Sequence, residues 1–277
     1  MKNPIKALAG AVGRWNELRR MPLRLEFVLT DTCNLNCKGC THYSPLAPKE
    51  FADLELMERN MEHLAAVCGD EVQSLYLIGG ETLLYPQLIE VMEALRRHFP
   101  SRDLYIFTNG IALPKMDDRF WATASRLGFI IAITRYPIRF DYDAAIELCR
   151  SNGVRTEVFG DRSLADTFFK FALDPEKKQN PRLSHFKCYN RGCLSVVGDR
   201  LYPCSISGCV SHLNRATGTD FRHSQGDYLQ IDRITSVKQI FNLRNKPVPF
   251  CGYCIQPARS VGYGPSRRDK FEWVNGQ

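Results

Sequence analysis

The sequence predicts an α/β protein built on a parallel sheet, and three observations support this class. From residue 23 to residue 159, short β-prone runs alternate with amphipathic stretches of helical periodicity, which is typical of repeated strand–helix units. Five such units are visible, whereas a closed barrel of this type has eight. The last third of the chain holds six of the eleven cysteines. We therefore expect a domain at residues 23–187, followed by a small cysteine-rich α+β extension at residues 188–277.

The strand–helix units can be placed by residue range. The first strand, residues 23–30, alternates apolar and polar residues, and the next helix has Asp53 as its N-cap and Gly69 at its end. Residues 161–187 contain no clear strand and are expected to form a polar connector with a packed aromatic patch at Phe168, Phe169 and Phe171. The other expected strands are 74–78, 103–107, 129–134 and 154–159, and the expected helices are 53–68, 88–99, 117–127 and 141–152.

Charge and cysteine usage exclude several classes of protein. Residues 1–22 are expected to form a basic helical lead-in, because arginines interrupt their short apolar patch in a way that does not fit a signal peptide. No apolar run approaches the length of a membrane span. The net charge of +7 comes from scattered Lys and Arg, which fits a solvated surface better than a nucleic-acid site. Eleven cysteines without an export signal indicate metal binding in the reducing cytoplasm.

The loop after the first strand carries the most informative motif, CxxxCxxC at Cys33, Cys37 and Cys40. Loops at the carboxyl ends of parallel strands are where α/β barrels keep their chemistry. A structural zinc site is closed by four protein ligands, whereas a reactive centre needs an open position. Iron–sulfur clusters are normally held by four thiolates, so three cysteines leave one iron open to a small ligand. His42 follows the motif and is expected to be a packed or surface histidine.

Two later strand ends carry residues suited to ligand binding. Gly79-Gly80-Glu81 joins two small residues, which permit close backbone approach, to a carboxylate that can accept from an ammonium group. Thr108-Asn109-Gly110 follows the third strand, and its role is expected to lie mainly in shaping the turn. Cys68 and Cys149 fall on apolar helix faces and are expected to be buried small residues.

These motifs together resemble those of the radical S-adenosylmethionine (radical SAM) superfamily. The resemblance implies a partial, open (β/α) TIM-like barrel, a 4Fe–4S cluster on Cys33, Cys37 and Cys40, and S-adenosylmethionine on its free iron. It also implies that Gly79, Gly80 and Glu81 hold the methionine amino group, with polar contacts from Asn109, Thr134 and Arg135. Two positions depart from the family pattern: Gly39 stands where an aromatic residue is frequent, and Thr82 replaces a frequent proline.

The cysteines of the last third suggest a second metal site. Residues 194–197 and 200–202 flank Gly198-Asp199, the pattern of a tight hairpin. A hairpin with cysteines near its ends, joined to the distant Cys251-x-x-Cys254 pair, can assemble four thiolates. Spacing alone does not separate zinc from iron at this site.

The resemblance favours iron, because this part is similar to the twitch extension, the shorter relative of SPASM that holds one auxiliary cluster. The implied ligands are Cys188, Cys204, Cys251 and Cys254, with Cys193 as the main competitor and Cys209 as a spare residue. The tail at residues 257–277 is expected either to close over the barrel mouth or to contact an acidic substrate. For Trp273 we expect plain packing.

We therefore expect an enzyme that cleaves S-adenosylmethionine reductively to a 5′-deoxyadenosyl radical and abstracts hydrogen from a small molecule or peptide. The auxiliary cluster would accept an electron or bind the substrate, and a reductant such as flavodoxin or ferredoxin would supply electrons. No residue is assigned as catalytic. The alternatives are a noncatalytic zinc- or cluster-binding interaction protein and a radical SAM enzyme that modifies RNA, which would bind RNA in a salt-dependent way.

Overall fold

The computed structural model describes residues 21–159 and 167–275. The basic helix expected in residues 1–22 therefore falls almost wholly outside the described residues. The first described element is a strand, and the chain then alternates strands and helices as far as residue 159.

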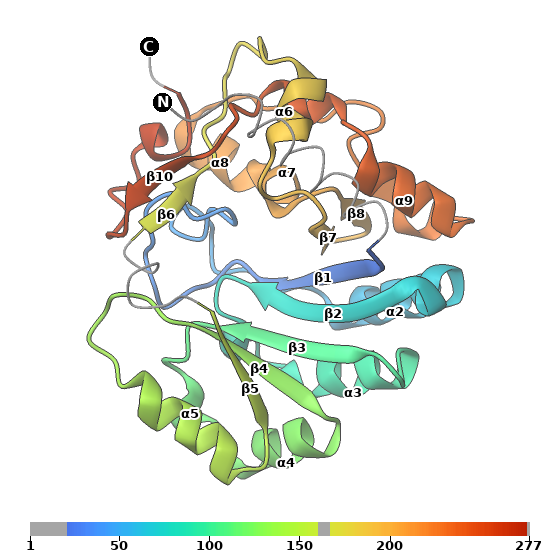
Figure 1. Cartoon of the computed structure of the whole chain (residues 1–277), viewed down its shortest axis with the longest axis vertical. Helices are drawn as coiled ribbons and strands as arrows, with labels where there is room; N and C mark the ends of the chain where they lie inside the picture. The colour runs from blue at the N-terminus through green and yellow to red at the C-terminus, as the bar shows by residue number, and fades with distance from the viewer. Residues whose placement is uncertain (1–20, 160–166, 276–277) are drawn as a thin grey trace, which may run out of the picture.

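Five parallel strands lie side by side in chain order and form the larger part of one sheet. Four helices pack against one face of these strands (Figure 1). Apolar side chains such as Phe27, Leu77 and Ile106 belong to the buried core of the protein. This arrangement confirms the predicted α/β class and the expected strand–helix units. The strands are β1 (Leu23–Thr30), β2 (Val72–Gly79), β3 (Asp103–Thr108), β4 (Phe129–Thr134) and β5 (Arg155–Phe159), and the helices are α2 (Leu54–Cys68), α3 (Leu88–His98), α4 (Asp118–Arg126) and α5 (Tyr142–Ser151).

The caps follow from the sequence. The Asp53 side chain accepts from the backbone N–H of Leu56 at the start of α2, and Gly69 is the C-cap residue of that helix. Asp117 and Asp141 cap α4 and α5 in the same way. Because a short carboxylate satisfies amide donors that the first helical turn leaves free, these residues fix where each helix begins.

The predicted hairpin is confirmed as β7 (Leu194–Val197) and β8 (Arg200–Tyr202). Its position was not predicted: β7 pairs in parallel with β1, so the hairpin continues the main sheet on the other side of β1. β9 (Leu229–Gln230) adds the last strand, and the order is β5-β4-β3-β2-β1-β7-β8-β9. Both edges of this sheet are open within the described residues, as expected for a partial barrel.

The prediction that residues 161–187 form a polar connector without a clear strand was wrong for residues 167–187. β6 (Thr167–Lys170) pairs antiparallel with β10 (Arg259–Gly262) in a separate sheet, and α6 (Pro181–Lys187) follows. The signal for this helix was present in the sequence, since Asn180 caps it and Pro181 occupies its first turn. Residues 161–166 lie outside the described residues.

The remaining elements lie beside β1, on the side away from β2 (Figure 1). None of the helices in the described ranges combines the length and the apolarity needed to cross a bilayer. These elements are the helices α7 (Ser205–Gly208), α8 (Val210–Thr217) and α9 (Val237–Asn245). Elsewhere along the described chain, short 3-10 turns occur at Gly69–Glu71, Thr82–Leu84, Leu113–Lys115, Ile231–Arg233, Pro249–Gly252 and Lys270–Glu272.

Candidate functional site

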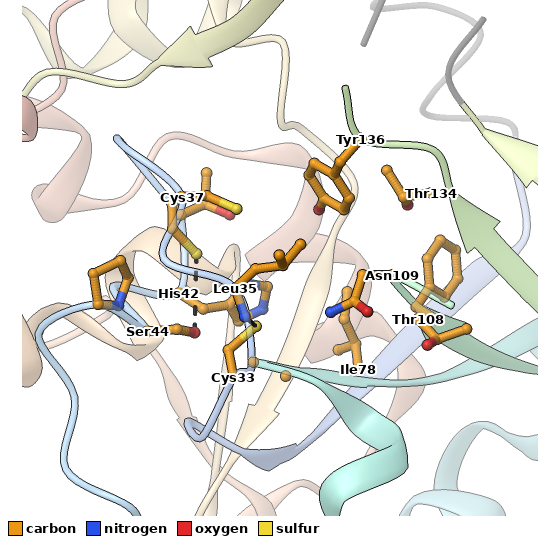
Figure 2. Close-up of a pocket in the computed structure, with 16 residues that line it drawn as sticks. Cys33, Leu35, Cys37, His42, Ser44, Ile78, Thr108, Asn109, Thr134 and Tyr136 are labelled. Atoms are coloured by element: carbon orange, nitrogen blue, oxygen red, sulfur yellow. Dashed lines mark hydrogen bonds between the residues drawn. The ribbon is translucent and has the colours of Figure 1, made fainter. Parts of the chain in front are cut away.

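A pocket of about 200 Å³ lies at the carboxyl ends of the first four strands, and the three cysteines of the CxxxCxxC motif line it together (Figure 2). The glycines of the Gly-Gly-Glu element line the same pocket. The sequence analysis anticipated this convergence because parallel strands end at one edge of a sheet. The other lining residues are Leu35, Thr41, His42, Ser44, Pro45, Ile78, Phe107, Thr108, Asn109, Thr134 and Tyr136.

The electrostatics of Cys33 and Cys37 suit a bound cation. The pKa of Cys33 and that of Cys37 are both raised to about 12, mainly by burial and to a smaller extent by nearby negative charge, from Glu81 on Cys33 and from Cys40 on Cys37. Thiols with such pKa values stay protonated at neutral pH unless a cation compensates the thiolates. Because thiolates are the form that binds metal, the donor set fits an iron–sulfur cluster whose irons supply that charge.

The C-terminal tail holds the cysteine loop in place. The Lys38 N–H donates to the Gly264 carbonyl oxygen at 2.9 Å, and the Ser266 N–H donates to the Asn36 carbonyl oxygen at 2.7 Å. The Tyr263 hydroxyl lies 3.9 Å from Cys37 Sγ. The tail therefore packs against the loop itself. Trp273 is 2% exposed, which confirms the packing expected of it.

Gly79 and Gly80 permit a close approach, but the neighbour is the protein's own backbone. A Cβ atom on Gly79 would lie 2.3 Å from the Thr30 carbonyl oxygen, and one on Gly80 would lie 2.4 Å from the Thr32 carbonyl oxygen. The Gly80 N–H donates to the same Thr30 oxygen at 2.7 Å. These glycines therefore allow the cysteine loop to sit directly against the end of β2, while they also line the pocket.

Glu81 is buried behind the pocket lining. Its Oε1 accepts from Thr108 Oγ1 at 2.6 Å and from the Leu83 N–H at 3.1 Å, and its Oε2 accepts from the Asn109 N–H at 2.9 Å. Burial raises the pKa of Glu81, and these hydrogen bonds oppose that rise. The carboxylate thus fixes the Thr108–Gly110 turn and retains acceptor capacity on Oε2. Its contact with an ammonium group stays a prediction.

The last predicted cofactor contacts divide into two groups. Asn109 and Thr134 line the pocket, and Asn109 Nδ2 donates to Asn34 Oδ1 at 2.6 Å, which ties the turn to the cysteine loop. Arg135 instead pairs with Asp143 at 2.6 Å and is not part of the pocket lining. Sequence reasoning missed Tyr136, whose ring lies 5.6 Å from that of Tyr263. Its only signal was its place two residues beyond the end of β4.

Comparison with known proteins identifies this part of the chain. Residues 27–136 match the family model of the Radical SAM superfamily. The chain carries a radical SAM domain. The match confirms the resemblance inferred from the motifs and supports a 4Fe–4S cluster and S-adenosylmethionine as the cofactors of the domain.

Curated relatives of the radical SAM domain align over part of their length. The bovine (Bos taurus) molybdenum cofactor biosynthesis protein 1 is 30% identical over 120 residues, covering 43% of this chain and 19% of the relative. The GTP 3′,8-cyclase of Paenarthrobacter nicotinovorans is 32% identical over 117 residues, covering 40% of this chain and 31% of the relative. The chain thus spans less than a third of either relative.

A solved structure extends the likeness in fold to nearly the whole chain. The crystal structure of BtrN in complex with AdoMet and 2-DOIA has a TM-score of 0.54 and 13% identity, and the match covers 92% of this chain and 99% of that one. At this identity the likeness concerns the fold alone, and it supports the partial-barrel class.

The second cysteine group lies beyond the radical SAM domain, and its four predicted ligands come from three separate segments of the chain. Cys188 follows α6, Cys204 precedes α7, and Cys251 and Cys254 lie in and after the turn at Pro249–Gly252. After burial, charge on Cys188 and Cys251 raises the pKa of Cys204, and charge on Cys204, Cys251 and Cys188 raises that of Cys254. Cys188 acts in the same way on Cys251. Every pair among the four thiols is therefore close enough to interact.

Cys193 and Cys209 have other surroundings. Burial raises the pKa of Cys193, followed by the charge of Glu26 and a hydrogen bond with it, while the charges of Cys204 and Cys188 contribute less. Cys209 is affected mainly by burial and then by Asp31. In the described ranges, no three His, Cys, Asp or Glu side chains converge around a position for one metal ion. The auxiliary ligand set stays a prediction.

A pair of polar side chains, His212 and Asp31, lies at the start of the cysteine loop. His212 Nε2 on α8 lies 3.0 Å from Asp31 Oδ2. Burial lowers the pKa of the nearby His42 to about 4, and the charge of Asp31 opposes this change. His42 is 8% exposed, which agrees with the prediction of a packed histidine.

Proposed function

We propose that this chain is a radical SAM enzyme whose reactive cluster is held by Cys33, Cys37 and Cys40. The observation that carries the proposal is the presence of these three thiols, with no fourth among the described residues, in the lining of one pocket that also contains Gly79 and Gly80. When bound, the reduced cluster supplies the electron that splits S-adenosylmethionine into methionine and a 5′-deoxyadenosyl radical. The radical SAM domain at residues 27–136 supports this reaction class.

The chain's own residues would bind, orient and shield the cofactor. Gly80 and Asn109 would contact its methionine part, and Thr134 would contact its polar groups farther along the pocket. Glu81 would act on the amino group directly or through the turn that it holds. Ile78, Phe107 and Tyr136 line the pocket with apolar and aromatic surface, and such surface excludes water from a reactive intermediate.

We infer that Cys188, Cys204, Cys251 and Cys254 hold one auxiliary cluster, with Cys193 as the competing ligand. The mutual influence of these four thiols supports the set. Ser184 Oγ on α6 donates to the Cys254 carbonyl oxygen at 2.7 Å, so segments distant in sequence are held together at this site. This cluster would accept an electron from a substrate radical or bind the substrate.

For the substrate we propose a small molecule first and a peptide second. The solved structure similar to nearly the whole chain holds 2-DOIA, and two curated relatives carry GTP or a cofactor in their names. The electron donor would be a small reductant protein such as flavodoxin or ferredoxin. The reducing cytoplasm remains our proposal for the compartment, and all eleven cysteines are free thiols.

The test is anaerobic reconstitution of the full chain with iron and sulfide, followed by dithionite and S-adenosylmethionine. We expect two 4Fe–4S clusters per chain and formation of 5′-deoxyadenosine and methionine. Cys37→Ser should abolish cleavage and remove the iron of one cluster. Cys149→Ser is the matched control, because Cys149 is 0% exposed on α5 and lies away from the pocket lining.

Two results would contradict the proposal. Zinc in both sites of protein purified without added metal, with no cleavage after reconstitution, would indicate a noncatalytic interaction protein instead. Cleavage that survives in the Cys37→Ser variant would show that the cluster lies elsewhere.

A further inference from the structure

One side chain in the pocket lining has a buried polar atom whose role is not explained by the contacts of the protein. His42 is more than nine-tenths buried, and its Nε2 atom has no hydrogen-bond partner among the described residues. An unpaired buried donor or acceptor destabilises the fold, because it has given up its hydrogen bonds to water without gaining a partner. A native fold tolerates this cost at sites where a ligand completes the hydrogen bond.

The position of His42 indicates which ligand would complete it. His42 lies two residues after Cys40 and lines the pocket. Figure 2 shows it with Cys33, Cys37 and Ser44 on one side of the pocket, away from Thr134 and Tyr136. This is the side where the cluster would sit, whereas Thr134, which would contact the polar groups of S-adenosylmethionine farther along the pocket, lies opposite.

A second side chain on this side of the pocket, Ser44, can also donate a hydrogen bond toward the cluster site. The Ser44 hydroxyl lies 3.9 Å from Cys40 Sγ (dashed line in Figure 2), so it can donate to that sulfur once it is a thiolate. The imidazole ring retains at least one N–H in either protonation state. The neighbouring Asp31 and His212 bond each other through Oδ2 and Nε2, and their other polar atoms, Asp31 Oδ1 and His212 Nδ1, are also unpartnered.

We propose that the N–H of His42 donates a hydrogen bond to a sulfur of the reactive cluster and thereby raises its reduction potential. The inference rests on the proposed function, because it requires a cluster on the three cysteines. Hydrogen bonds to cluster sulfurs stabilise the reduced, more negative state. His42 is then a positioning and tuning residue, because it does not touch the reacting carbon.

The test compares His42→Phe with His42→Gln in the reconstituted full chain. Phenylalanine keeps an aromatic ring and removes the donor, whereas the glutamine amide places an N–H near the position of Nε2. The reduction potential is measured by EPR-monitored titration of the signal that changes when S-adenosylmethionine is added. We expect His42→Phe to lower the reduced-to-oxidised ratio at fixed potential about tenfold, equivalent to about 59 mV for one electron, and His42→Gln to restore most of it.

The other outcomes would overturn either the inference or the proposed function. An unchanged potential in His42→Phe overturns the inference, and so do equal shifts in both variants, which would indicate packing. A change in affinity for S-adenosylmethionine without a change in potential would assign His42 to the cofactor and also overturn it. If wild-type protein assembles no cluster that responds to S-adenosylmethionine, the proposed function fails instead.

A measurement on the unsubstituted protein covers the case in which the variants do not fold. In protein labelled with 15N-histidine, the reduced cluster should show 15N hyperfine coupling in pulsed EPR, since His42 is the histidine of the pocket lining. The absence of this coupling in wild-type protein that holds the cluster contradicts the hydrogen bond.

Discussion

Trp273 Nε1 donates a hydrogen bond to the carbonyl oxygen of Cys40 across 2.8 Å. The indole also lies beside Tyr43, with ring centroids 6.1 Å apart, and both side chains are almost completely buried. A residue near the end of the described chain thus fixes the third cysteine of a motif located more than two hundred residues earlier.

We predict that Trp273→Phe loosens the cysteine loop. The substitution keeps an aromatic ring but removes the donor, so the partly buried Cys40 carbonyl loses this partner, at a cost of about 1 kcal/mol. The reconstituted variant should lose its N-terminal cluster faster in air than wild type does, measured as decay of the iron–sulfur absorbance. Trp121→Phe is a matched control, because Trp121 Nε1 also donates to a backbone carbonyl, that of Met116, at 3.2 Å in a partly buried position. Equal decay in the two variants would contradict a role specific to the loop.

We predict that Gly80→Ala destabilises the fold. The new Cβ atom would lie 2.4 Å from the Thr32 carbonyl oxygen and 2.6 Å from its carbon, so backbone must move. Overpacking of this kind costs about 1–3 kcal/mol, and the urea midpoint should fall accordingly. Gly69→Ala serves as the control, since a Cβ there meets nothing within 4 Å and the residue is right-handed helical. A Gly80→Ala midpoint equal to that of wild type would contradict the close contact.

We predict that substitutions of the cysteines in the last third of the chain differ in their effect on iron content. Cys204→Ala and Cys254→Ala should each remove the iron of one cluster, because the three remaining thiols leave the set incomplete. Cys209→Ala should keep full iron content. Cys193→Ala should also keep full iron content if Cys193 is not a ligand. A loss of iron in Cys193→Ala would show that Cys193 replaces one of the four proposed ligands. Iron and sulfide analysis after reconstitution measures each variant.

We predict an acid-side loss of stability that depends on His223. Burial lowers the pKa of His223 below its ordinary value of 6.5, and a hydrogen bond from the ring to Ser207 opposes this change. The unfolded chain therefore takes up the proton first as pH falls below about 6.5, and the free energy of unfolding declines. Urea midpoints measured anaerobically at pH 7.5 and 5.5 should differ less in His223→Gln than in wild type. The same difference in both proteins would exclude His223 as the source.

The fold of residues 23–159 could be predicted because local and global signals agree there. Strand alternation, aspartate caps and the glycine after α2 all point to one repeating unit, and parallel strands place their ends together. The position of β7 could not be predicted in this way. A four-residue apolar run pairs with whichever edge the rest of the fold leaves open, and here that edge belongs to β1.

The site was predictable where chemistry depends on spacing and unpredictable where it depends on tertiary contact. The three cysteines and Gly79 and Gly80 were found from their motifs. Tyr136, the tail contacts at Tyr263 and the pairing of Asp31 with His212 have no local pattern, because their partners are distant in sequence. Arg135 was predicted as a cofactor contact because it follows a strand end, but its side chain pairs with Asp143 on α5.

The hydrogen bonds between the tail and the cysteine loop have a consequence for biosynthesis. The loop around Cys40 emerges from the ribosome early, but its supports at Tyr263 and Trp273 emerge only after most of the chain has been translated. Until then the three thiols stand on a loop without those supports, exposed to adventitious metals and oxidants. Productive cluster insertion should therefore follow synthesis of residues 263–273, and slowed translation of these residues should lower the yield of active protein more than the yield of polypeptide.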